Sequence, residues 1–281
     1  MHEAYWKLQQ KPFENTPDPR FIYYSQKHQE ALSRMLYAVK EQKGAAILTG
    51  EYGSGKTLLS RVLLKELSSE QYQTAIIFNP MLAPLKLLKE IIYQLGGDTA
   101  ALSYKTDLLH YFNGMLYKNK NEKKNTVIVI DEAQAIPLQA FEELRLLLNF
   151  QLNEVFLFTL ILLGQPELKT KMDKLPQLKQ RFSIRYHLKA LAEEQTKEYV
   201  LHRLKVAGAE REIFRDDALG EIYRFSGGIP RRINNICDLA LLVGCAEELE
   251  KVDKEIIKDV AEDLEEIPID AIEEVKSIAN G

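Results

Sequence analysis

GAAILTGEYGSGKTLLSRVLLKEL, residues 44 to 67, decides the fold class of this 281-residue chain. A short apolar run, Gly44 to Thr49, precedes a glycine-rich turn, and apolar residues at helical spacing follow from Lys56 to Leu67. The turn itself, Gly50 to Thr57, reads G-x-x-x-x-G-K-[ST]. This is the spacing of a phosphate-binding P-loop, and it lies in the required place between a strand and a helix.

The turn carries the residue types that bind a polyphosphate. Glycines let the backbone wrap around phosphate groups, and successive N–H groups with the following helix N-terminus attract the negative charge. Lys56 would add a point charge on the β- and γ-phosphates, and Thr57 would offer a hydroxyl to Mg²⁺. A chance match in a chain of this length is on the order of one per cent. We therefore predict a site for ATP and Mg²⁺ formed by Gly50, Gly53, Ser54, Gly55, Lys56, Thr57 and Leu58.

Two carboxylates follow the apolar run VIVI, residues 127–130, which is typical of a strand buried on both faces. Ligands of open α/β sheets bind at this end of the strands. Asp131 suits a role in holding Mg²⁺ through water, and Glu132 suits the orientation and deprotonation of the attacking water. The alternative is an acidic cap for the helix that follows. The sequence has no N-K-x-D element for reading guanine, which favours ATP, and the acidic pair disfavours a nucleoside monophosphate kinase.

Strand-like and helix-like segments alternate up to Leu188. Further strands are predicted at Thr74–Phe78, Val155–Leu163 and Ile184–Leu188, helices at Leu85–Leu95, Tyr104–Tyr117 and Leu138–Phe150, and a charged loop at 118–125. This alternation predicts an α/β fold with a parallel sheet flanked by helices. Only helices are predicted beyond it, at Glu193–Val206, Asp216–Phe225, Pro230–Glu247 and Asp253–Leu264. We predict an α/β nucleotide-binding domain at 1–188, a small all-helical lid domain at 189–265 and a weakly specified tail at 266–281.

Composition narrows the function classes. The net charge of -4 and the pI of about 5.9 give no basic footprint for nucleic acid over the whole chain. Cys237 and Cys245 lack metal-ligand or redox spacing and are expected to be reduced core thiols. The N-terminal stretch MHEAYWKLQQKPF lacks the apolar run of a secretory signal, and the longest apolar run falls far short of the ~20 residues of a membrane helix. We expect a cytoplasmic protein that does not span a membrane, with peripheral docking at the inner membrane left open.

At this point the chain resembles the AAA+ ATPases and, more narrowly, the family of ExeA (general secretion pathway protein A) and MshM. The segments that carry the narrower resemblance are Pro12-Phe13, TPDPRFIYYS (16–25), LTGEYGSGKT (48–57), DEAQ (131–134), ELRLLLNFQ (143–151), LLGQPEL (162–168), LKQRFSIRYHLKAL (178–191) and GGIPRRINNICDLAL (227–241). The resemblance implies an ATP-hydrolysing, nucleotide-dependent homo-oligomer that acts as a motor or switch. Its partner would be a protein of an envelope machine for secretion or pilus assembly.

The same resemblance implies roles for further residues. Gln165 matches the polar sensor-1 residue, and Arg231 in GGIPR matches the sensor-2 arginine of the lid. Arg181 lies where such proteins present an arginine finger to a neighbouring subunit, with Arg185 as a second candidate; the alternative for both is a solvated basic stretch. Gln165 could instead be a plain residue at a helix start. Phe21, Ile22 and Tyr23 match positions that often line the adenine pocket, or they are ordinary core residues.

Two other functions stay open from the sequence. A DNA-associated ATPase of the transposition-regulator type shares much of this core, and the basic stretch 169–189 would be its binding surface. A nucleotide-gated scaffold with negligible turnover is disfavoured by Glu132, because a pure switch has less need of a base. ExeA-type proteins often continue into a membrane helix and a peptidoglycan-binding domain, and neither is present in this sequence. The expectation of an envelope role therefore rests on the resemblance of the ATPase region alone.

Overall fold

The computed structural model describes residues 2–152, 155–265 and 269–270. Within it the chain forms two compact units. The α/β unit consists of the described residues within 26–52 and 59–188, and the helical unit consists of the described residues within 2–25, 53–58 and 189–270. The tail predicted at 266–281 lies outside the described residues, apart from 269–270.

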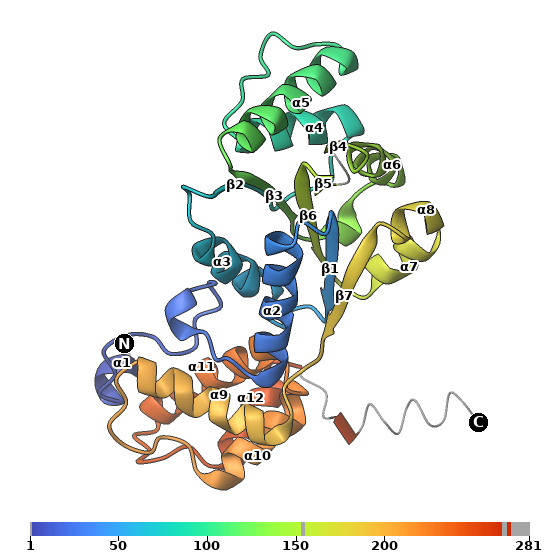
Figure 1. Cartoon of the computed structure of the whole chain (residues 1–281). Helices are drawn as coiled ribbons and strands as arrows, with labels where there is room; N and C mark the ends of the chain where they lie inside the picture. Colours follow the sequence, from blue (N-terminus) through green and yellow to red (C-terminus); the bar gives the residue numbers. More distant parts are fainter. Residues whose placement is uncertain (1, 153–154, 266–268, 271–281) are drawn as a thin grey trace, which may run out of the picture. The chain divides into compact units, whose positions relative to one another are not determined.

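Five parallel strands form the sheet of the α/β unit (Figure 1). In spatial order they are β2 (Tyr72–Ile77), β3 (Asn125–Ile130), β6 (Phe158–Gly164), β1 (Ala45–Gly50) and β7 (Phe182–Leu188). All four neighbouring pairs are parallel. The predicted fold class, a parallel sheet flanked by helices, is confirmed.

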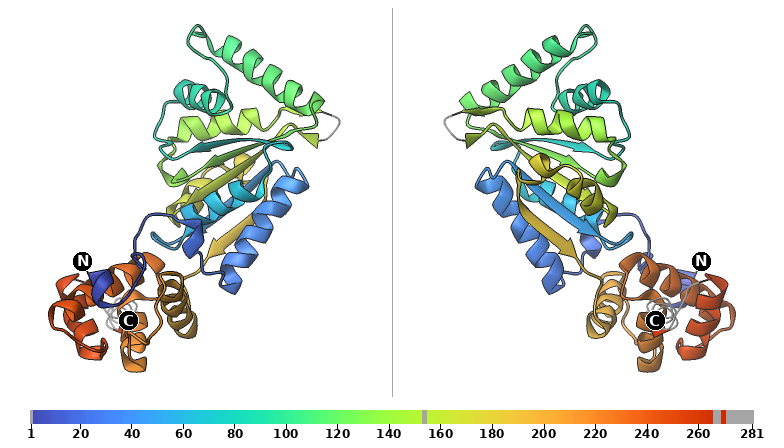
Figure 2. Two further views of the ribbon diagram at one scale, coloured as in Figure 1. Left: turned by 90° about the vertical axis from the view of Figure 1, so that its left-hand side faces the viewer. Right: turned by 90° about the vertical axis from the view of Figure 1, so that its right-hand side faces the viewer.

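Helices cover both faces of this sheet (Figure 2). One face carries α2 (Gln26–Lys40) and α3 (Lys56–Glu66), and the other carries α4 (Pro84–Gln94), α5 (Lys105–Asn121) and α6 (Leu138–Leu147). The short helices η2 (Ala133–Ala135), α7 (Glu167–Asp173) and α8 (Pro176–Lys179) follow the ends of β3 and β6. Because both faces are covered, β6 is buried along its whole length, and β3 is buried from its second residue on.

The structure corrects three sequence predictions in this unit. Helix α2 was not predicted. Residues 118–121 are helical rather than part of a loop, and the Asn119 side chain, buried in the last turn of α5, donates to Thr126 Oγ1 at 2.9 Å. The predicted strand Val155–Leu163 is interrupted, because β5 (Val155–Phe156) forms an antiparallel pair with β4 (Gln151–Leu152) before β6 begins at Phe158.

The helical unit contains the four helices predicted for the lid: α9 (Glu193–Val206), α10 (Asp216–Ser226), α11 (Pro230–Ala246) and α12 (Lys254–Asp263). The N-terminal residues, with α1 (His2–Tyr5) and η1 (Pro19–Phe21), pack into the same core. Trp6, Phe13 and Phe21 are all buried in the hydrophobic cluster of this unit. Residues 1–25 thus pack with the helices from 189 on, although the sequence grouped them with the α/β domain. The domain limits themselves stay a prediction.

A buried arginine holds this N-terminal segment in place. Arg203 on α9 is 6% exposed, and its guanidinium donates to Pro12 O at 2.5 Å and to Glu14 O at 3.0 Å. It also donates to Tyr199 Oη at 2.8 Å, and it lies 5.0 Å from the centre of the Phe21 ring. The positive charge is therefore surrounded by hydrogen-bond acceptors and an aromatic face, as a buried guanidinium requires.

Replacing this arginine is expected to destabilise the helical unit. Arg203→Met removes the donors and leaves the buried carbonyl of Pro12 and the partly buried carbonyl of Glu14 without them, which costs about 2–4 kcal/mol of unfolding free energy. Urea titration followed by circular dichroism measures the change. Lys205→Met on the exposed side of the same helix is the control and should have a negligible effect. Equal stability of the two variants would contradict the assignment.

Neither cysteine forms a disulfide, as predicted. Cys237 is fully buried on α11, and burial raises the pKa of its thiol well above the ordinary value. Cys245 is only half-buried, so the prediction of two core thiols holds for one of them. Among the described residues, no helix combines the length and the apolar character needed to cross a membrane.

Candidate nucleotide-binding site

Three neighbouring strands end at one edge of the sheet. Thr49 on β1 lies beside Gly164 on β6, and Ile130 on β3 lies beside Leu162 on β6. The residues that follow these strands therefore emerge close together. They are the P-loop that starts at Gly50, the carboxylate Asp131 and the amide Gln165. Within the α/β unit the structure thus brings Gly50, Asp131 and Gln165 to the edge where α/β proteins bind ligands.

The P-loop has the backbone geometry of a phosphate cradle. Gly53 and Gly55 have φ angles of +79° and +97°, in the left-handed region that side chains disfavour. Helix α3 begins at Lys56, so its N-terminal N–H groups follow the loop directly. The side chains of Ser54 and Lys56 are buried, whereas Thr57 and Leu58 are half-buried. These features fit a polyphosphate.

Arg231 lies beside this loop within the helical unit. It is in the first turn of α11, after Pro230, and its backbone N–H donates to Gly53 O at 3.3 Å. A Cβ built on Gly53 would lie only 2.5 Å from Arg231 Cβ, so the loop needs glycine at this position. The contact is compatible with the predicted sensor-2 role of Arg231, which it does not test.

The acidic pair occupies the end of β3 in two different environments. Asp131 is 2% exposed, and its Oδ1 accepts from the backbone N–H of Glu132 at 2.9 Å. Glu132 has φ +50° and ψ +36°, a left-handed conformation that costs a non-glycine residue about 1–2 kcal/mol. Its carboxylate makes no capping hydrogen bond to η2, so Glu132 does not act as the acidic helix cap of the alternative interpretation. Strained backbone of this kind is common where a side chain has to be aimed.

Two glutamine side chains hold the Glu132 carboxylate. Gln134 Nε2 donates to Glu132 Oε2 at 2.5 Å, and Gln165 Nε2 donates to the same oxygen at 3.3 Å. Gln134 Oε1 in turn accepts from the backbone N–H of Gln165 at 2.9 Å. We name these three residues the Glu132 clamp. Gln134 was missed as a site residue, although it stands in the DEAQ segment two positions after Glu132.

Helix α7 contacts the loop that carries Gln134 of the clamp. Lys171 Nζ donates to the backbone carbonyl of Gln134, and it also donates to Ile136 O at 3.2 Å. A side chain from the helix that follows β6 thus fixes the loop that follows β3. Gln165, predicted as sensor 1, lies between these two elements and touches the proposed base directly.

The two candidate finger arginines differ in their contacts. Arg185 donates to two backbone carbonyls, those of Phe182 at 3.0 Å and Lys179, which ties it to its own strand. Arg181 makes one surface hydrogen bond, from Nη2 to Asn149 Oδ1 at 2.7 Å. It precedes β7, whose first residue lies beside Ala45 at the start of β1. At 3.3 Å per residue this is roughly 20 Å from the edge with Asp131, so Arg181 cannot serve its own chain's site.

The three predicted adenine contacts have packing roles in the helical unit. Phe21 and Ile22 are buried, and Phe21 lies under the Arg203 guanidinium. The Tyr23 hydroxyl donates to the Glu198 carboxylate, and the pKa of Tyr23 is raised by burial and by this hydrogen bond. These contacts agree with the alternative of ordinary core residues, and an adenine contact stays a prediction.

The donor set fits a magnesium ion that is held largely by phosphate. Among the described residues no group of three or more His, Cys, Asp or Glu side chains could hold a metal by itself. Mg²⁺ in phosphate sites takes one or two protein oxygens and completes its shell with water and phosphate oxygens. Thr57 and Asp131 offer a hydroxyl and a carboxylate of this kind.

Comparison with known proteins agrees with this geometry. Residues 39–172 match the family model described as an AAA domain. Over 257 residues the chain is 40% identical to general secretion pathway protein A of Aeromonas hydrophila, which covers 90% of this chain. Over most of its length the chain is similar to the ExeA-like AAA+ proteins. The resemblance read from the sequence is thereby confirmed. This AAA+ chain spans 46% of the length of that relative, so the two are comparable only over the shared part.

Solved structures support the same fold for this AAA+ protein. The ORC2 protein of Aeropyrum pernix in ADPNP–ADP complexes superimposes with a TM-score of 0.68 at 17% identity, over 90% of this chain and 71% of that chain. The ORC1 protein of Aeropyrum pernix in complex with DNA gives a TM-score of 0.66 at 17% identity, over 92% and 70%. At these identities the likeness concerns the fold alone.

Proposed function

We propose that this AAA+ protein hydrolyses ATP with Mg²⁺ and works as an oligomeric motor or switch for a bacterial envelope machine. The observation that carries the ATPase proposal is the common edge of β1, β6 and β3, where Gly50, Gln165 and Asp131 emerge together. The assignment of an envelope machine rests on the 40% identity with general secretion pathway protein A.

Each residue of the site has one task in this proposal. The loop N–H groups and Lys56 bind the phosphates, and Thr57 and Asp131 hold the metal. When bound, Mg²⁺ supplies positive charge that offsets the charge on the phosphate oxygens. Glu132 orients a water molecule and accepts its proton once its carboxylate is released from the amides of Gln134 and Gln165. Gln165, already in contact with Glu132, positions the same water.

Metal removal tests the enzymatic part of the proposal. We expect steady-state phosphate release from ATP with Mg²⁺ present, and its loss in excess EDTA, because the phosphate charge is then unscreened. Restoring Mg²⁺ should restore the rate, which serves as the control for protein integrity. No release above the rate of the Glu132→Gln variant would reject ATP hydrolysis as the function.

Oligomerisation is tested through Arg181. Because this side chain lies at the sheet edge away from its own Asp131, we propose that it completes the site of a neighbouring copy. Arg181→Ala is expected to lower turnover by about 10³-fold with ATP binding retained. Arg185→Ala, which removes bonds to the chain's own carbonyls, serves as the comparison. Undiminished hydrolysis in Arg181→Ala would remove the finger assignment.

The envelope partner requires an experiment in the native cell. The Glu132→Gln variant with ATP should accumulate in the ATP-bound state and retain a partner that the ADP-bound protein releases. We expect a protein of a secretion or pilus system at the inner membrane, where this chain would act peripherally. Capture of the same proteins by the Lys56→Ala variant would argue against a nucleotide-dependent partner.

A DNA-associated ATPase is the second candidate. Lys169, Lys179 and Arg185 lie together on the α/β unit, and this cluster is the specific observation in its favour. The net charge of -4 weighs against it. A gel-shift titration with ATP at low and moderate salt separates the candidates, because phosphate contacts weaken steeply with salt. The absence of any shift at ~50 mM salt would dismiss DNA binding.

A further inference from the structure

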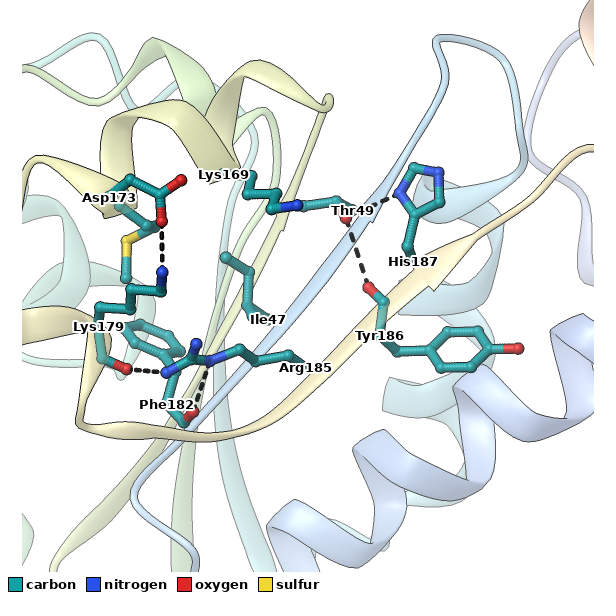
Figure 3. A pocket seen from close by; sticks show the side chains of 10 residues that line it. Ile47, Thr49, Lys169, Asp173, Lys179, Phe182, Arg185, Tyr186 and His187 are labelled. Atoms are coloured by element: carbon teal, nitrogen blue, oxygen red, sulfur yellow. Dashed lines mark hydrogen bonds and ion pairs between the residues drawn. The ribbon is translucent and has the colours of Figure 1, made fainter. Parts of the chain in front are cut away.

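A cavity lies in the α/β unit beside the edge strand β7 (Figure 3). Its volume is about 300 Å³, which is the lower range of small-ligand sites. The floor is apolar, and charged side chains surround it. The lining residues of β1 and β7 are Ile47, Thr49, Phe182, Arg185, Tyr186 and His187, and those of the α7–α8 segment are Lys169, Met172, Asp173 and Lys179.

A bulge in β7 creates the polar side of this cavity. Ala45 lies beside Phe182, but Ala46 lies beside Ile184, so one extra residue is inserted in β7. The insertion shifts the alternation of side chains. As a result Arg185 lies opposite Ile47, and His187 lies opposite Thr49, on the same face. The side chains of Arg185 and His187 thus face the cavity, and the aromatic ring of Phe182 forms part of its apolar floor.

The cavity carries excess positive charge. Lys179 is paired with Asp173 at 2.5 Å, which neutralises one lysine. Arg185 donates its hydrogen bonds to backbone carbonyls, which carry no net charge to offset that of the guanidinium. Lys169 Nζ and His187 Nε2 make no hydrogen bond or ion pair with any described residue, and Figure 3 shows Lys169 extending toward Thr49 and His187. These groups are arranged to receive an anion.

We propose that this cavity binds an anion with an apolar body, a carboxylate or phosphate carried on an aromatic or aliphatic group, and that its binding slows ATP hydrolysis. Ile47, Met172 and Phe182 would contact the apolar body. Lys169, Arg185 and His187 would contact the charged group. The anion could be a free small molecule or an acidic side chain of a partner peptide. Anion binding is independent of the proposed function, whereas the slowing of ATP hydrolysis rests on it.

Two contacts link the cavity to hydrolysis. Helix α7 places Lys169 and Met172 on the cavity, while Lys171 on the same helix donates to the backbone of Gln134 in the Glu132 clamp. On the β7 side of the cavity, Thr49 Oγ1 lies 3.0 Å from His187 Nδ1. Thr49 is the residue directly before Gly50, where the P-loop starts. An anion that contacts both Lys169 and His187 would hold α7 and β7 in place. It would thereby stabilise the hydrogen bonds from the Gln134 and Gln165 amides to the Glu132 carboxylate.

Binding is tested first without hydrolysis. Phenyl phosphate is titrated into the Lys56→Ala variant, where the P-loop no longer competes for phosphate, and the imidazole signals of the five histidines are followed by NMR. His187→Gln identifies the signal of His187. We expect a saturable shift of that signal, with inorganic phosphate binding about tenfold more weakly because it lacks the apolar body. Phenol, which lacks the charge, should produce no shift.

Charge variants locate the site. Adding Lys169→Gln should weaken phenyl phosphate binding by about tenfold, because one charge-assisted contact is lost. Lys174→Gln, an equal charge change at an exposed position just after α7, should leave the affinity unchanged. No saturable shift of His187 up to about 10 mM, or equal affinities in the two variants, overturns the site.

Turnover tests the coupling. In the protein with intact Lys56, saturating phenyl phosphate should lower ADP release severalfold, and Lys169→Gln should keep its basal rate and lose the response. An acidic peptide with an adjacent aromatic residue distinguishes a partner segment from a free ligand. Binding without any change in ADP release overturns the coupling. If the wild-type protein shows no turnover at all, the proposed function fails and the coupling with it, while the binding result stands.

Discussion

Glu132→Gln is expected to lower steady-state ATP turnover by about 10²–10⁴-fold while ATP binding is retained. The amide keeps the size of the side chain and its place between Gln134 and Gln165, but it cannot accept a proton from water. The left-handed backbone at Glu132 is unchanged by this substitution. The effect is therefore confined to the chemical step, and binding through the P-loop is left intact.

Phosphate release under saturating Mg-ATP measures this effect, and a fluorescent ATP analogue measures binding in parallel. Glu167→Gln is the matched control, since this carboxylate is exposed in the first turn of α7, two residues after Gln165. It should turn over like the wild type. Equal rates in wild type and Glu132→Gln would leave Glu132 without its proposed role, and negligible rates in both would favour the nucleotide-gated scaffold.

Lys56→Ala should weaken Mg-ATP binding by at least about 10²-fold, because a charged contact to the phosphates is lost from a water-poor site. Lys56 is 5% exposed at the start of α3, so water does not replace the missing charge efficiently. Hydrolysis should be lost together with binding. Isothermal calorimetry with Mg-ATP measures the heat directly.

Lys65→Ala provides the comparison for this variant. Lys65 is exposed in the last turn of the same helix, so its removal changes the net charge equally and leaves the loop intact. We expect the wild-type binding heat in Lys65→Ala and none in Lys56→Ala. Equal heats in the two variants would contradict phosphate binding by the P-loop and, with it, the assignments of Asp131 and Arg231.

The features that depend on local pattern were predictable. The P-loop, the buried strand before Asp131 and the four helices after Leu188 are each marked by spacing within one segment, and all lie within a residue or two of the structure. Helix α2 was not predicted, although it also carries buried residues at helical spacing, namely Ala31, Met35, Ala38 and Val39. The signal for this helix is therefore present in the sequence.

The features that depend on distant contacts were not predictable. Trp6 and Phe13 look like any apolar residues near a chain start, and nothing nearby in the sequence indicates that Arg203 binds their segment. Gln134 gains its significance from Gln165, which belongs to another strand. The cavity beside β7 results from a one-residue bulge, and an apolar-polar alternation read from the sequence does not reveal the side on which Arg185 lies.

The anchoring of the N-terminal segment has a consequence for biosynthesis. The Trp6 indole N–H donates to the backbone carbonyl of Leu241 at 2.8 Å, across 235 positions of the chain. A ribosome makes residue 6 first and residue 241 near the end, at about 5–20 residues per second. For most of translation the first aromatic residues therefore have no native neighbours. The core of the helical unit can be completed only after almost the whole polypeptide has been made. The strands of the sheet, which lie between residues 45 and 188, can assemble earlier.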